Sequence, residues 1–104
     1  MDGMDRTGEG SGARLDVEYV DVAGDLDAGT AELARSALLM SSAATVVADL
    51  RDLSFCDSAG LAVLLHVRLI LEEEGRSLAL AKPPRQFEEL IQLAGVKHSF
   101  AIVE

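Results

Sequence analysis

Short apolar runs alternate with longer segments rich in Ala and Leu along this chain, and this alternation constrains the fold more than any other feature. The runs that we expect to form strands are residues 15–22, 44–50, 77–81 and 100–103. The segments that we expect to form helices are residues 28–40, 59–74 and 84–94. Strands that alternate with helices build a mostly parallel sheet with right-handed crossovers. We therefore predict a single α/β domain with a central sheet of about four strands, three to four helices and the order β-α-β-α-β-α-β.

Glycine, proline and aspartate mark the expected element boundaries. The Gly-Asp-Leu-Asp segment at 24–27 should break the first strand, and Asp27 is a good N-cap for the first helix. Gly75 and Gly95 stand where the second and third helices should end, and Pro84 suits the first turn of the third helix. After the second strand, residues 50–55 are expected to continue as extended chain toward the long helix.

Charge and length limit the classes of partner. The chain has 104 residues, with 9 basic and 18 acidic side chains and a formal net charge of −9. A nucleic-acid binder needs clustered Lys and Arg, and an anionic membrane surface repels an acidic protein, so we expect neither partner. The longest apolar stretch, residues 61–71, is well short of the roughly 20 residues that span a bilayer. The first residues lack the features of a signal peptide, which favours a cytoplasmic location.

Two further features concern the N-terminus and the lone cysteine. Residues 1–13 hold four glycines among acids and almost nothing apolar, so we expect a disordered arm before a domain at 14–104.

Cys56 is the only cysteine, which rules out an internal disulfide and a Cys-rich metal site. We interpret Cys56 as a buried structural thiol, and we expect no metal ion and no cofactor.

Two polar segments lie where a strand passes into a helix. They are the Gly-Asp-Leu-Asp segment at 24–27 and the Asp-Ser-Ala-Gly segment at 57–60. Both follow strands, so both should open at the same edge of a parallel sheet, where ligands and partners usually bind. Ser58 would stand at a helix N-terminus, which favours an anion, beside the small residues Ala59 and Gly60. The structural alternative is that Ser58 is a helix N-cap and Gly60 a packing residue.

From residue 24 onward the chain resembles a STAS domain of the anti-sigma-factor antagonist type. Four segments carry the resemblance, in the family's order: Gly24–Asp27, Val46–Leu50, Leu53–Leu61 and Leu93–Val96. A single short motif would be weak, whereas four in the right order make a specific match.

The resemblance implies a phosphorylation switch. In that family the serine that matches Ser58 is phosphorylated by a partner anti-sigma factor that is a serine kinase. The unphosphorylated protein binds the anti-sigma factor and frees a sigma factor, and a phosphoserine phosphatase resets the switch. The resemblance thus implies a binding module and not an enzyme. The expected partner-binding residues are Asp25, Asp27, Asp57, Ser58, Ala59 and Gly60.

Two alternatives stay open at this point. One is a STAS module that acts without phosphorylation, as a scaffold or as a subunit in lipid transport. The other is a receiver-like domain that carries its phosphate on Asp49, with Asp25 and Asp27 as an acidic pair for magnesium and Lys82 after a later strand. Against the receiver, such domains need five strand-helix units, and only four strands and three helices are expected here.

Overall fold

The computed structural model describes residues 16–104, so the expected disordered arm at 1–13 and the domain start at 14 lie outside the described residues. The strands are β1 (Val17–Asp21), β2 (Gly24–Leu26), β3 (Thr45–Asp49), β4 (Leu53–Cys56), β5 (Ser77–Ala81) and β6 (Ala101–Val103). The helices are α3 (Ala31–Leu39), α4 (Ser58–Glu73) and α5 (Arg85–Leu93), with a 3-10 turn, η1 (Lys97–Ser99).

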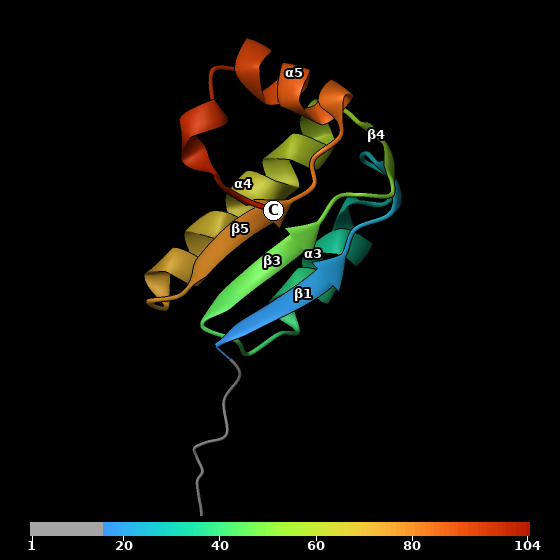
Figure 1. Ribbon diagram of the computed structural model, residues 1–104. Coiled ribbons are helices and arrows are strands. Elements are labelled where there is room, and N and C mark those ends of the chain that lie inside the picture. Colours follow the sequence, from blue (N-terminus) through green and yellow to red (C-terminus); the bar gives the residue numbers. More distant parts are fainter. Residues whose placement is uncertain (1–15) are drawn as a thin grey trace, which may run out of the picture.

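Four of the strands form one parallel sheet in the order β1-β3-β5-β6 (Figure 1). Strands β2 and β4 form a separate, two-stranded parallel sheet. The strands of the main sheet alternate with the helices along the chain, as the sequence pattern requires, whereas β2 and β4 are additional strands. The predicted α/β class, with a mostly parallel sheet of four strands and three helices, is therefore confirmed.

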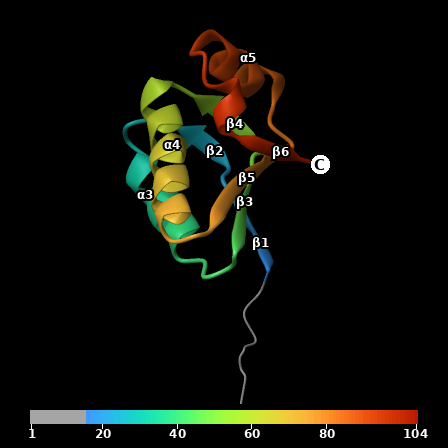
Figure 2. The same cartoon turned by 90° about the vertical axis from the view of Figure 1, so that its left-hand side faces the viewer.

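The core lies between the four-stranded sheet and helices α3 and α4, which both cover the same face of the sheet (Figure 2). Helix α4 turns one apolar side to this core through the buried residues Leu61, Leu64, Val67 and Leu71. Strand β3 is buried on both faces, which fits its apolar, β-branched sequence. Val46 and Ala48 join the helix-covered core, whereas Val47 packs with Ala79 and Ala81 in a second cluster.

The expected break at 24–27 is wrong in part, because residues 24–26 form strand β2. The residues after β3 are also not continuous extended chain. Instead the Leu53 N–H donates to the Leu50 carbonyl oxygen at 3.0 Å, which closes a turn and sends β4 away from the main sheet. The local sequence pattern shows neither strand β2 nor the turn before β4, because β2 and β4 are stabilised by pairing with each other.

The first helix begins later than predicted, and Asp27 is not its N-cap. Helix α3 starts at Ala31 with Thr30 at the N-cap position. Asp27 instead closes the preceding turn, where its Oδ1 accepts the N–H groups of Gly29 at 2.9 Å and Thr30 at 3.2 Å. The other helix ends follow the sequence more closely, since Gly75 and Gly95 adopt the left-handed conformation just after α4 and α5.

Candidate functional site

The junction between β4 and α4 is built around the Asp57 side chain. Asp57 is the N-cap of α4, and its Oδ1 accepts the N–H of Gly60 at 3.0 Å. Its carbonyl oxygen accepts the N–H of Leu61 at 2.9 Å, the first bond of the helix. Asp57 therefore satisfies donors that the first turn of a helix otherwise leaves free.

Because Asp57 caps the helix, Ser58 does not. The structural alternative that made Ser58 the N-cap is wrong, since Ser58 is the first residue of α4. Its side chain is exposed, and no described residue forms a hydrogen bond with its hydroxyl. Ala59, the next residue, is half-buried. The hydroxyl thus stands free at the positive end of a helix of 16 residues.

Gly60 is buried and packs against β2, as the structural alternative expected of this residue. A Cβ atom at this position would lie 2.2 Å from the carbonyl oxygen of Leu26 and 2.8 Å from its Cγ. Only glycine permits so close an approach of helix to strand. Gly60 therefore acts by letting α4 pack on β2, which brings the two polar segments together.

The junction between β2 and α3 holds the other two predicted aspartates in a closed network. The Thr30 hydroxyl donates to the Asp25 carbonyl oxygen at 2.7 Å and accepts the Asp27 N–H at 3.0 Å. Asp27 is half-buried, with its carboxylate used in the turn. Asp25 is exposed, so its carboxylate is free to meet a partner.

Pairing of β2 with β4 places the two junctions next to each other. Asp25 is the register partner of Phe55, and Leu26 is that of Cys56. The Asp57 N–H also donates to the Leu26 carbonyl oxygen at 3.3 Å. The structure therefore brings Asp25 close to the segment that carries Ser58, as expected for strand ends at one edge.

Phe55 belongs to this surface and was not singled out in the sequence. Its ring is 49% exposed, although Phe is usually buried. Leu53, two residues earlier on the same short strand, is buried, and in a regular strand the two side chains would share a face. The β2–β4 register shifts between these positions, so the local pattern does not tell that Phe55 faces the solvent.

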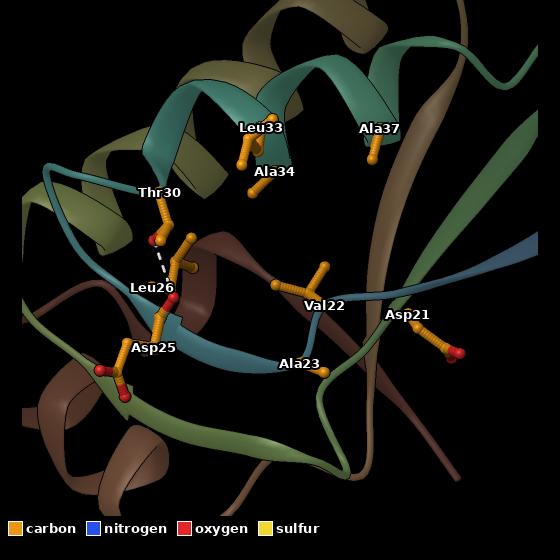
Figure 3. A pocket seen from close by; sticks show the side chains of 9 residues that line it. All are labelled: Asp21, Val22, Ala23, Asp25, Leu26, Thr30, Leu33, Ala34 and Ala37. Atoms are coloured by element: carbon orange, nitrogen blue, oxygen red, sulfur yellow. Dashed lines mark hydrogen bonds between the residues drawn. The ribbon is translucent and has the colours of Figure 1, made fainter.

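A groove of about 280 Å³ lies between α3 and the β1–β2 segment (Figure 3). Its walls are partly apolar, with Val22, Leu26 and Leu33 among the lining residues, and partly polar. The carboxylates of Asp21 and Asp25 point away from the space between the helix and the strand, and Thr30 is hydrogen-bonded to the Asp25 backbone (Figure 3). Neither of these carboxylates therefore supplies a charged group for binding or catalysis inside the groove.

Asp49, the phosphate acceptor of the receiver-like alternative, is engaged elsewhere. Its carboxylate is 7% exposed and accepts the backbone N–H of Arg51 at 3.0 Å and the guanidinium at 2.8 Å. These hydrogen bonds hold the pKa of Asp49 below its usual value. The register partners of Asp49 are Asp21 and Ala81, whereas Asp25 lies on β2 in the other sheet and Asp27 follows it. Lys82 does lie near enough to lower the pKa of Asp49, but the Asp49 carboxylate is already engaged by Arg51.

Cys56 fits the interpretation of a structural thiol. It is half-buried, and burial, together with the negative charge of Asp57, raises its pKa to about 11. Within residues 16–104 no three His, Cys, Asp or Glu side chains gather as a metal site. In the same range, no helix combines the length and the apolar character needed to cross a membrane.

Comparison with known proteins gives the family. The family described as Mlab, STAS domain, matches residues 9–104. No curated protein matches the chain in sequence. A putative anti-sigma factor antagonist from Thermotoga maritima has a similar structure, with a TM-score of 0.76 and 19% identity over 86% of this chain and 80% of that one.

Two other solved structures share the fold. The anti-sigma factor antagonist SpoIIAA in its unphosphorylated form has a TM-score of 0.69 and 22% identity, covering 88% of this chain and 83% of its own. A sulfate transporter family protein from Wolinella succinogenes has a TM-score of 0.72 and 17% identity, covering 86% and 75%. At such identities the likeness shows the fold. Because the family match extends across both polar junctions and the whole sheet, the chain belongs to the STAS domain family.

Proposed function

We propose that this protein is an anti-sigma factor antagonist, switched by phosphorylation of Ser58. The unphosphorylated form binds an anti-sigma factor that is a serine kinase, and a sigma factor is released. Phosphorylation of Ser58 ends the binding, and a phosphoserine phosphatase restores it. The protein acts in the bacterial cytoplasm as a binding module, with no catalytic residue and no cofactor of its own.

One observation carries the proposal: the Ser58 hydroxyl is exposed at the start of α4, while Asp57 performs the capping. A serine needed as a cap would lose its structural bond on modification. Here the hydroxyl is available to a kinase, and the helix N-terminus favours the charge of the product. One protein of similar fold, SpoIIAA, is described as an anti-sigma factor antagonist in its unphosphorylated form, which supports the same class of switch.

The switch acts through charge at the docking surface. A phosphoserine carries about two negative charges at neutral pH. Asp57 is adjacent in sequence, and Asp25 is exposed on the neighbouring strand. A partner that packs over Ala59 would have to desolvate a dianion in an already acidic surface, which costs several kcal/mol. Phosphorylation therefore weakens binding without unfolding the domain.

The test is phosphorylation by a defined kinase. Each anti-sigma kinase encoded in the same genome is purified and incubated with the chain and ATP, and the labelled residue is mapped by mass spectrometry. Label on Ser58 is expected, and it should disappear in Ser58→Ala. The matched control is Ser54→Ala, because Ser54 is also exposed and lies four residues earlier. Label that persists in Ser58→Ala, or none from a kinase that binds the chain, contradicts the proposal. A label lost in hydroxylamine would point to an acyl phosphate on an aspartate.

A second candidate is a STAS module that binds its partner without phosphorylation, as a scaffold or as a subunit in transport across or between membranes, lipid transport included. The observation in its favour is the similar fold of the sulfate transporter family protein from Wolinella succinogenes. This candidate predicts that no kinase labels the chain and that Ser58→Asp leaves partner binding unchanged.

A further inference from the structure

Phe55 is an exposed aromatic residue at the edge of the Ser58 surface. Its ring is 49% exposed, and it lies on β4 two residues before Asp57. In the parallel pair β2–β4 its register partner is Asp25. Register partners project on the same face of a sheet, so Phe55 and Asp25 share one outer face. The next pair, Leu26 and Cys56, projects on the opposite face, toward the core.

The surroundings of the Phe55 ring are acidic. Asp25 is exposed beside it, and Asp57 and Ser58 follow after Cys56 along the chain. In the turn before β4, the guanidinium of Arg51 is paired with Asp49 at 2.8 Å and also lies in the field of Asp52. Arg51 is therefore already ion-paired, whereas no described Lys or Arg forms an ion pair with Asp25 or with Asp57, whose carboxylate accepts the Gly60 N–H.

We infer that Phe55 is the apolar anchor of the docking surface, and that the partner receives the ring in an apolar pocket edged by Lys or Arg. The inference rests on the proposed function, since the partner is the anti-sigma kinase. Aromatic residues carry much of the binding energy at protein interfaces, where they fill desolvated pockets. Basic side chains around that pocket complement the negative charges of Asp25 and Asp57. This attraction guides the encounter with the partner and fixes the orientation of the complex.

The same geometry links the anchor to the switch. Phe55 and Ser58 are separated by Cys56 and Asp57, so a partner seated on the ring covers the Ser58 hydroxyl. The ring therefore recruits the kinase to its substrate serine. When the serine carries phosphate, the charge lies at the edge of the contact that the ring makes.

The experiment uses the full chain and the kinase that binds it in the Ser58 mapping. Binding of Phe55→Ala is measured by calorimetry, with circular dichroism as the check on folding. A loss of at least about tenfold, or 1.4 kcal/mol, is expected. The control is Met40→Ala, where an apolar side chain is 84% exposed at the C-terminal end of α3, the end opposite the junction with β2, and its binding should not change. Asp25→Asn should weaken binding as well, and the weakening should fade as salt is raised.

Each outcome decides the inference. A folded Phe55→Ala that binds within about twofold of the original chain overturns it. If the Ala variant does not fold, Phe55→Thr decides, since Thr suits a strand but cannot fill an apolar pocket, and binding equal to the original chain would again overturn the anchor. Binding that does not depend on salt or on Asp25 would overturn the basic edge of the pocket. Failure of the proposed function looks different: Ser58 stays unlabelled by the bound kinase, while the Phe55 variants still lose binding.

Discussion

The two strand-to-helix junctions use similar residues in opposite ways. At the β2–α3 junction, the side chains of Asp27 and Thr30 each accept the other's backbone N–H, and the Thr30 hydroxyl also donates to the Asp25 carbonyl oxygen, so both side chains are used to close a turn. At the β4–α4 junction, Asp57 alone caps the helix through Gly60. Within residues 16–104, the Ser58 hydroxyl then has no hydrogen bond that the fold depends on.

The difference shows why one junction suits a switch and the other does not. Modification of Thr30 would break bonds that hold the turn before α3. Modification of Ser58 adds charge to a residue whose hydroxyl bonds to no other described residue. A site that must be changed reversibly is best placed where the fold does not depend on it, because stability is then kept in both states.

The largest effect is expected at Gly60, where the two junctions meet. Gly60→Ala should destabilise the domain by about 3 kcal/mol, because the new Cβ would overlap the Leu26 carbonyl oxygen. Inside a helix Ala is otherwise better than Gly by about 1 kcal/mol, so even the sign of the change is diagnostic. Gly29→Ala is the control at the other junction, where a Cβ would lie 3.4 Å from Asp27 Oδ1, an ordinary contact. Urea unfolding measures the free energy of unfolding of both variants. A Gly60→Ala variant as stable as Gly29→Ala would show that Gly60 does not closely approach Leu26.

Next in size is the effect of charge at Ser58 on partner binding. Ser58→Asp should keep its circular dichroism and its melting temperature within a few degrees, because a helix N-terminus favours an anion. Its affinity for the anti-sigma kinase should fall at least about tenfold, or 1.4 kcal/mol. Ser58→Ala should bind normally and escape inactivation. Unchanged affinity of Ser58→Asp would exclude repulsion as the mechanism, and a collapsed spectrum would exclude the helix-terminus argument.

The roles of two neighbouring residues can be separated by stability. Asp57→Ala should cost about 1 kcal/mol of unfolding free energy, because the Gly60 N–H loses its acceptor. Ser58→Ala should change it by no more than about 0.5 kcal/mol, as is usual for an exposed site without bonds. Asp57→Asn keeps a capping oxygen and should fall between them. Equal losses for Asp57→Ala and Ser58→Ala would mean that Ser58 does cap the helix.

The smallest effect concerns Cys56 and appears only at high pH. Burial, with a contribution from Asp57, raises the pKa of the Cys56 thiol to about 11, so the folded state retains a proton that the unfolded chain releases near 9. The stabilisation is therefore complete below pH 9 and is lost as the pH rises through 11. Cys56→Ala should show a flatter loss of stability over that window in urea unfolding. Identical slopes for both proteins would indicate that the thiol titrates as in the unfolded chain.

The polar segment before α4 could be located from the sequence, whereas the role of Asp27 could not. Asp57, Ser58 and the start of α4 were placed within one residue, because a polar cap before a long apolar repeat is a local signal. Asp27 was predicted as the N-cap of the first helix but closes the preceding turn, since a capping carboxylate and a turn-closing carboxylate have the same sequence signature. The choice between them depends on Thr30, whose hydroxyl bridges Asp25 and Asp27.

The sequence by itself determined the α/β class, the order of the helices and main strands, and the location of a serine at a helix start. These follow from periodicity, glycine and capping, which act over a few residues. Only the tertiary structure decided that β2 pairs with β4, that Gly60 is buried against Leu26, and that Phe55 faces the solvent beside Asp25. Those outcomes depend on contacts between segments some 30 residues apart. A strand of only three or four residues has too little local pattern to predict which strand it pairs with.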